Sequence, residues 1–236
     1  MRAITLMLKT LWSPGAAFAE IREARIGPWV PIAVTIAFGL LNTFLLTNRV
    51  DVGDALMREF MRNPQVSNMS AEQLAEMRQG MEQGAPLIRA AFYGIAVAFP
   101  FASVIVAGLY FGIFLVLGSR SGFMSFWATT AFAFTPMMIG SIASIGVMYT
   151  IPPAAMQLGQ LNVLSPAVFL DPNVEAGAIY ALAQALSLTT IWTLCLLIIG
   201  YGVVGTKRSS TTLRSVVVVT PWLLTVALRV LPALLF

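Results

Sequence analysis

Residues 89–118, RAAFYGIAVAFPFASVIVAGLYFGIFLVLG, carry no charged side chain after the opening arginine. An apolar run of about 20 residues is long enough to cross the hydrocarbon core of a bilayer as an α-helix. This stretch is longer than one straight crossing needs. Pro100 lies near its middle and predicts a kink, because proline removes a backbone hydrogen bond from a helix. We therefore expect residues 89–118 to form a kinked membrane span.

Four further stretches have the length and composition of membrane spans. They are residues 28–47, 125–150, 177–204 and 213–236. Pro136 predicts a second kink, within the span 125–150. The whole chain agrees, since 58% of its residues are hydrophobic and 10% are charged, against about 25% charged in soluble domains. We predict an all-α, polytopic membrane protein in which residues 28–236 form a bundle of five transmembrane helices.

The first 27 residues differ from the spans that follow. Ser13 and Pro14 are typical of a helix start, as N-cap and first helical residue. The amphipathic segment 1–27 either lies at the membrane surface or packs on the protein as an ordinary exposed helix. Lys9 interrupts the apolar run that a signal peptide would need. We expect this segment to be uncleaved and cytoplasmic.

A hydrophilic segment, residues 48–88, separates the first two spans. Ser70 and Gln73 have the spacing of a capping box at a helix start, and Gly84 with Pro86 predicts the end of that helix. We expect a helical hairpin outside the membrane. Its apolar faces are expected to contact either a partner protein or the protein's own outer loops, through Met57, Phe60, Met61, Leu74, Met77 and Met81.

The positions of the basic residues predict the orientation. Loops that stay in the cytoplasm carry an excess of lysine and arginine. The segments before the first span, between the second and third, and between the fourth and fifth hold eight of the 14 basic residues. The loop 151–176 holds none. We predict a cytoplasmic N-terminus in a bacterial inner membrane, with these topology anchors: Arg22, Arg25, Arg120, Lys207, Arg208 and Arg214.

The composition excludes several kinds of chemistry. The chain has no histidine and a single cysteine, Cys195, which rules out histidine-dependent triads, histidine-containing zinc sites and intrachain disulfides. No Asp, Glu or Lys falls clearly inside a predicted span, and an ion-coupled transporter usually needs such a residue. The basic residues form no stripe that would bind nucleic acid. We predict no catalytic residues, no metal and no cofactor.

Small and polar residues inside the spans predict helix packing. Gly108 with Gly112 and Gly140 with Ser144 are small-residue pairs four apart, a spacing that lets two helices approach closely. Three neutral polar residues in the spans are expected to hydrogen-bond between helices: Asn42, Gln184 and Thr190.

Several segments together resemble bacterial Yip1-domain proteins. They are residues 12–21 (WSPGAAFAEI), 29–31 (WVP), 118–126 leading to Pro136, 162–170 (NVLSPAVFL), and 186–192 (LSLTTIW) running into Gly200. The resemblance covers essentially the whole chain. At two positions the chain departs from the family pattern, because Ser187 stands where an aspartate is usual and Thr189 where an aromatic residue is usual.

The resemblance implies a five-helix membrane domain with a cytoplasmic N-terminus. Eukaryotic members are linked to vesicle trafficking and small prenylated GTPases, a role that we do not expect this chain to share. Some bacterial relatives accompany ABC-type exporters that work with a periplasmic adaptor. A family of this kind names a fold more firmly than a function.

Two functional hypotheses from different classes follow. The first is a non-catalytic membrane scaffold or accessory subunit of an envelope complex, with a membrane partner such as an ABC-type exporter. The alternative is a transporter or channel for a lipid or small apolar solute, with the helices kinked at Pro100 and Pro136 around a cavity. A membrane enzyme ranks third, and the sequence predicts no oligomeric state.

Overall fold

The computed structural model describes residues 1–61, 69–153, 156, 158–170, 177–205 and 210–235. These residues form α-helices and short 3-10 turns, which confirms the all-α prediction. The membrane-length helices are α3 (Trp29–Arg49), α6 (Phe99–Val116), α7 (Phe123–Ala133) continued by α8 (Pro136–Met148), and α11 (Thr211–Leu235). The pair α9 (Gly177–Ala185) and α10 (Leu188–Val204) bends by 46° at its junction and makes a fifth candidate crossing if the two helices form one broken span. The protein is therefore a polytopic helical bundle.

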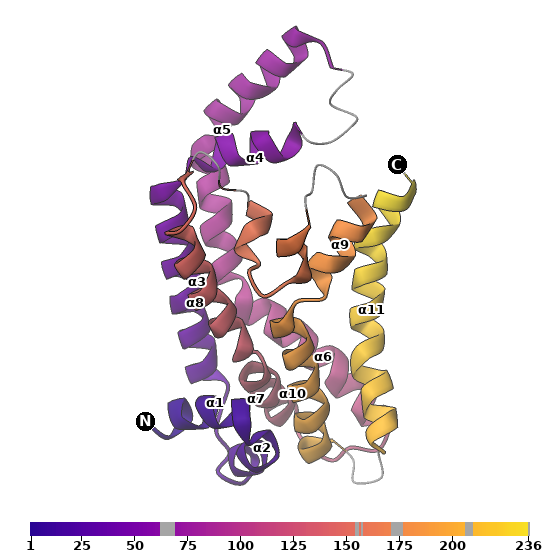
Figure 1. Cartoon of the computed structure of the whole chain (residues 1–236). Helices are drawn as coiled ribbons and strands as arrows, with labels where there is room; N and C mark the ends of the chain where they lie inside the picture. Colours follow the sequence, from indigo (N-terminus) through magenta and orange to yellow (C-terminus); the bar gives the residue numbers. More distant parts are fainter. Residues whose placement is uncertain (62–68, 154–155, 157, 171–176, 206–209, 236) are drawn as a thin grey trace.

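The remaining helices lie at the two ends of this bundle. The first two, α1 (Arg2–Trp12) and α2 (Pro14–Glu23), lie across one end, at the bottom of Figure 1. The hairpin of α4 (Val52–Phe60) and the first part of α5 (Ala71–Val97) projects from the other end, near the C-terminus. Two 3-10 turns, η3 (Leu158–Leu161) and η4 (Pro166–Phe169), line the link between α8 and α9. We call the two ends the α1–α2 end and the hairpin end.

The second span begins differently from the prediction. The capping box is present, since the Gln73 amide donates to Ser70 Oγ at 3.2 Å and the Ser70 amide donates to Gln73 Oε1 at 2.9 Å. The expected helix end at Gly84 and Pro86 is wrong, because α5 continues to Val97. Pro86 is exposed, so the backbone carbonyl that loses its helical donor there faces the surroundings and not a packed core.

Both predicted kink prolines lie at helix boundaries. The cap of α5 is Ala98, and Pro100 lies in the first turn of α6. Pro136 opens α8 three residues after Ala133, the last residue of α7. Proline is well tolerated in a first helical turn, where the missing N–H has no helical acceptor. The predicted spans 89–118 and 125–150 are therefore each made of two consecutive helical pieces.

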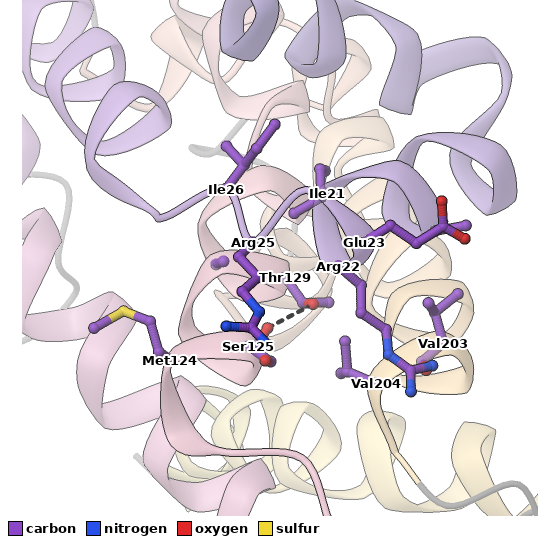
Figure 2. A pocket seen from close by; sticks show the side chains of 12 residues that line it. Ile21, Arg22, Glu23, Arg25, Ile26, Met124, Ser125, Thr129, Val203 and Val204 are labelled. Carbon is purple, nitrogen blue, oxygen red and sulfur yellow. Dashed lines mark hydrogen bonds between the residues drawn. The ribbon is translucent and has the colours of Figure 1, made fainter.

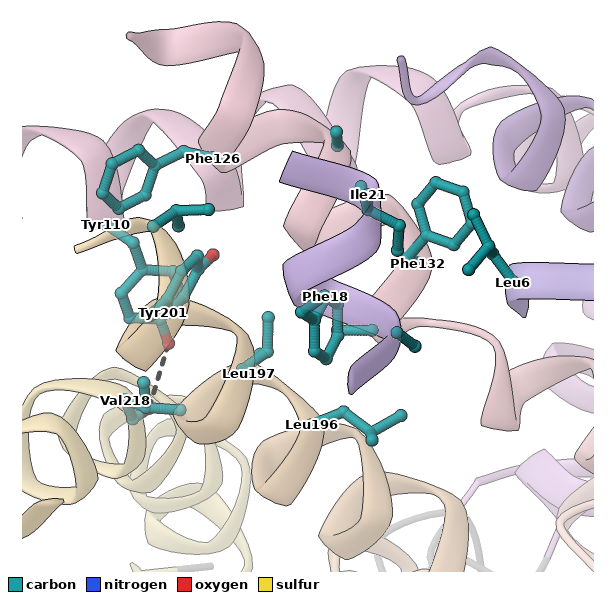
Figure 3. Close-up of a cluster of buried hydrophobic side chains, with 14 of the residues drawn as sticks. Leu6, Phe18, Ile21, Tyr110, Phe126, Phe132, Leu196, Leu197, Tyr201 and Val218 are labelled. Atoms are coloured by element: carbon teal, nitrogen blue, oxygen red, sulfur yellow. Dashed lines mark hydrogen bonds between the residues drawn. The ribbon is translucent and has the colours of Figure 1, made fainter. Parts of the chain in front are cut away.

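The main buried core lies near the α1–α2 end (Figure 3). Its centre is aromatic, with Tyr110, Phe114, Phe126 and Tyr201 in contact at ring-centroid distances of 4.9 to 5.7 Å. The helices α1 and α2 contribute Leu6, Phe18 and Ile21 to the same cluster. Their apolar faces thus pack on the bundle, which is the second of the two alternatives raised for this segment.

Candidate functional site

The hairpin holds a groove between α4 and α5, with a volume of about 770 Å³. Residues from both helices line it: Asp54, Met57, Arg58, Met61, Ala71, Leu74, Ala75 and Arg78. A second cavity, of about 210 Å³, lies between the same helices, and Met81 is among the residues that line it. Four of the six predicted contact residues therefore line these two cavities, and Phe60 and Met77 are not among the lining residues.

The two sides of α4 have different environments. Val52 and Ala55 are buried, and Ala55 packs in a small cluster with Met148 and Met156. That side contacts the protein's own outer segments. Met61, by contrast, is 50% exposed at the edge of the groove. The self-packing alternative thus applies to the face with Val52 and Ala55, and partner contact through the exposed side stays a prediction.

The groove combines apolar walls with charged residues. Among the described residues, Asp54, Arg58 and Arg78 form no ion pair within 4.0 Å. Protein interfaces commonly have an apolar centre with a polar rim, and methionine adapts its shape to different partners. The groove therefore has the chemical character of a protein-binding surface.

A second large cavity, of about 740 Å³, lies at the α1–α2 end (Figure 2). It is enclosed by the end of α2, the start of α7 and the end of α10. Arg22 and Arg25 line it, and Arg22 Nη1 donates to the Val203 carbonyl oxygen at 2.8 Å. No feature of the sequence indicated this cavity, because it is formed by residues about 180 positions apart.

The predicted topology anchors gather at the α1–α2 end. Arg22 lies in the last turn of α2, and Arg25 follows that helix. Arg120 precedes α7, and Arg214 lies in the first turn of α11 at the same end (Figure 1). Arg214 donates to the Ser210 carbonyl and to Thr211 Oγ1. Lys207 and Arg208 lie outside the described residues. The described basic residues of the three segments thus share one side of the bundle.

An ion-paired cluster joins α1 to α2 at this end. The Glu20 carboxylate accepts from Lys9 Nζ at 3.0 Å, and from Arg2 Nε and Nη2 at 3.1 and 3.0 Å. The hydrogen bond from Lys9, followed by that from Arg2, holds the pKa of Glu20 below its ordinary value. The cluster lies at the surface, so it orients α1 on α2 more than it stabilises the fold.

A polar network surrounds the junction of α9 and α10. Asn162 Nδ2 donates to the Gln184 carbonyl and Oε1, and Ser165 Oγ donates to the Ala183 carbonyl at 2.7 Å. Ser187 is the N-cap of α10, because its hydroxyl accepts from the Thr190 amide at 3.2 Å. Serine and aspartate are about equally good N-caps. Ser187 therefore caps this helix about as well as an aspartate in its place would.

The three neutral polar residues have different partners. Asn42 donates to the Ser141 carbonyl at 3.3 Å, which joins α3 to α8. Gln184 bonds the loop before α9, through the Gly159 carbonyl. Thr190 bonds Ser187 in its own helix and not a neighbouring one.

The two small-residue pairs also differ. A Cβ atom on Gly140 would lie 3.3 Å from Thr189 Cγ2, so α8 and α10 approach closely there, and Ser144 is buried on the same helix. At Gly108 and Gly112, a Cβ atom would meet nothing within 4 Å in the described part of the chain. That pair therefore makes no close helix contact within the described chain.

Comparison with known proteins gives one match. A family model described as the Yip1 domain matches residues 8–231. No curated protein and no solved structure matches the chain. Within the described ranges, no three Cys, Asp or Glu side chains are grouped as metal ligands would be.

Proposed function

This chain belongs to the Yip1 domain family, and from that premise we propose that it is a non-catalytic scaffold or accessory subunit of an envelope complex. The protein is a multi-pass membrane protein. The observation that carries the proposal is the α4–α5 hairpin, an ordered projection outside the membrane-length helices with an apolar groove.

We further propose a bacterial inner membrane, with the α1–α2 end in the cytoplasm and the hairpin on the outer side. The gathering of Arg22, Arg25, Arg120 and Arg214 at one end supports this orientation. The partner that best suits it is an ABC-type exporter that works with a periplasmic adaptor, since the hairpin would then face the adaptor.

The test is a charge introduced into the groove. In the double variant Met61→Glu/Leu74→Glu, two carboxylates replace apolar side chains that line the groove. The matched control is Gln79→Glu/Gln83→Glu, which adds the same charge at exposed positions of α5 away from both cavities. Each tagged protein is purified in mild detergent, and its partners are quantified by mass spectrometry.

We expect an exporter to co-purify in stoichiometric amount with the unaltered chain and with the control variant. The groove variant should lose it. Melting temperatures of the three proteins establish that all are folded. Retention of the exporter by the groove variant, or its absence from the unaltered chain, would reject the proposal.

A second candidate function is transport of a lipid or small apolar solute. The 46° bend between α9 and α10 favours it, because transporters use broken helices with polar groups at the break. Purified protein in liposomes would then carry the lipid or solute across the bilayer unaided. Absence of flux with a range of lipids would reject this second function, and the scaffold proposal would then remain.

A further inference from the structure

The cavity at the α1–α2 end contains an arginine in an unusual backbone position. The helix α2 ends in a Schellman motif, in which the Ile26 amide donates to the Ile21 carbonyl at 3.0 Å and the Arg25 amide donates to the Arg22 carbonyl at 3.2 Å. Arg25 occupies the left-handed position of this motif, with φ of +50°. Glycine is the residue that usually stands there, because a Cβ atom is disfavoured in that conformation. Arginine therefore occupies a position where glycine would be under less backbone strain.

The position of Arg25 directs its side chain into the cavity. Figure 2 shows its guanidinium group beside Ser125 and Thr129, near the start of α7. The first turn of a helix carries a partial positive charge and backbone N–H groups without helical acceptors. The positive charge of Arg25 therefore adds to the partial positive charge at the start of α7 and does not offset it.

Arg22 approaches the same cavity from the last turn of α2. One of its N–H groups donates to the Val203 carbonyl at 2.8 Å, and a guanidinium group has five N–H donors in all. Among the described residues, neither Arg22 nor Arg25 has a carboxylate within 4.0 Å. Glu23 also borders the cavity, but its carboxylate points away from both guanidinium groups (Figure 2).

The other residues around the cavity are mostly apolar, apart from Glu23, Ser125 and Thr129. Ile21, Ile26 and Val204 are among its lining residues. At the same end of the bundle, Trp12 and Trp29 are 69% and 63% exposed. Exposed tryptophans are enriched where hydrocarbon meets headgroups. Two guanidinium groups beside apolar lining residues, at the height of a membrane surface, have the chemistry to bind a lipid phosphate with its acyl chains along the apolar residues.

We propose that this cavity binds the phosphate of an anionic phospholipid headgroup, with Arg25 and Arg22 as its charged donors. Arginine binds phosphate oxygens through paired N–H donors. The lipid's acyl chains lie along the apolar wall that Ile21, Ile26 and Val204 form. This site is separate from the hairpin groove, so its test is independent of the test of the scaffold proposal.

The decisive variant is Arg25→Gly. Glycine suits the left-handed position, so this variant is expected to melt at the same temperature as the unaltered chain or higher. The matched control is Arg120→Ala, which removes one positive charge from the same end at an exposed residue that does not line the cavity. Arg22 is left in place, since it also bonds the end of α10.

Binding is measured on the full chain in neutral-detergent micelles by native mass spectrometry and calorimetry. The probes are dioctanoyl phosphatidylglycerol, dioctanoyl phosphatidylcholine and inorganic phosphate. We expect one phosphatidylglycerol per chain, weaker binding of phosphatidylcholine, and still weaker binding of inorganic phosphate. Arg25→Gly should weaken phosphatidylglycerol binding about tenfold or more, and Arg120→Ala should leave it unchanged.

Each contrary result overturns a defined part of the proposal. Equal binding of the two lipids would reject recognition of negative charge. Inorganic phosphate bound as tightly as the lipid would reject a lipid as the ligand. Equal losses in Arg25→Gly and Arg120→Ala would show attraction by net charge alone, and a lower melting temperature of Arg25→Gly would give Arg25 a structural role.

Discussion

The hydroxyl oxygens of Thr130 and Tyr201 lie 2.7 Å apart and connect α7 to α10 inside the buried core. Thr130 donates its single proton to the Phe126 carbonyl at 2.8 Å, so Tyr201 must be the donor to Thr130. Both residues are fully buried. This bond fixes the rotation of α10 relative to α7, and it places the end of α10 beside the cavity at the α1–α2 end.

Replacing Tyr201 with phenylalanine removes this bond and keeps the ring. We expect a loss of about 1 kcal/mol in the free energy of unfolding, the usual net value of one buried hydrogen bond. The measurement is thermal or denaturant unfolding in detergent. Tyr149→Phe is the control, because Tyr149 is exposed and the variant keeps its ring, whose centroid lies 4.6 Å from Arg49 Cζ. Equal stabilities of the two variants would contradict the assignment.

Gly200 allows the close approach of α10 to its neighbours. A Cβ atom there would lie 2.5 Å from Thr129 Cγ2 and 3.2 Å from the Phe18 ring. Gly200→Val is expected to destabilise the protein by about 1–3 kcal/mol, because extra methyl groups in a packed core force neighbours apart. Gly112→Val makes the same change where, in the described structure, a Cβ atom meets nothing within 4 Å, and we expect a change within about 0.5 kcal/mol. Unfolding of the two variants in one detergent tests the difference.

Glu20 makes the joining of α1 and α2 sensitive to acid. Its pKa is lowered from 4.5 by the hydrogen bonds from Lys9 and Arg2. A carboxylate with a depressed pKa contributes stability above its ordinary pKa, and this contribution is lost as the pH falls through the folded value. We expect the melting temperature of the unaltered chain to exceed that of Glu20→Gln at pH 7, and the gap to close below about pH 4.5.

The control for this titration is Glu76→Gln. Glu76 is exposed on α5 and forms no ion pair in the described structure. Its substitution should leave the difference in melting temperature between neutral and acidic pH the same as in the unaltered chain. A gap between the unaltered chain and Glu20→Gln that persisted in acid would mean that the cluster does not act through the charge of Glu20.

Cysteine labelling tests the proposed orientation. In a Cys195→Ala background, the chain has no other cysteine. Gln79→Cys places a thiol on the exposed surface of the hairpin, and Gly122→Cys places one in the exposed link before α7. A membrane-impermeant maleimide should label the first in intact cells and the second only after the membrane is opened. The reverse pattern would place the N-terminus outside.

Helix existence and type were predictable because they depend on local composition. The apolar length of residues 213–236 and the capping spacing of Ser70 and Gln73 require no knowledge of distant residues, and both predictions agree with the structure. The end predicted at Pro86 was wrong, since a proline stops a helix only where its lost hydrogen bond is not tolerated. That condition depends on exposure, which the local pattern does not contain.

The candidate sites were predictable only in part. Methionines aligned on helical faces indicated the hairpin groove, because amphipathic spacing is a local property. Arg22 and Arg25 were identified as topology anchors, but their meeting at one cavity with α7 and α10 had no signal in the pattern. The two small-residue pairs looked alike in sequence, yet only Gly140 lies against a neighbouring helix.

The sequence by itself determined that this protein is a bundle of membrane helices with eight of its 14 basic residues in alternate links. Hydrophobic length and charge placement act segment by segment, so the bilayer sorts each one independently. Only the tertiary structure decided that Gly200 must stay small, that Ser187 caps a bent span, and that two arginines share a cavity. These features depend on contacts between residues far apart in the chain, and such contacts exist only once the helices have packed.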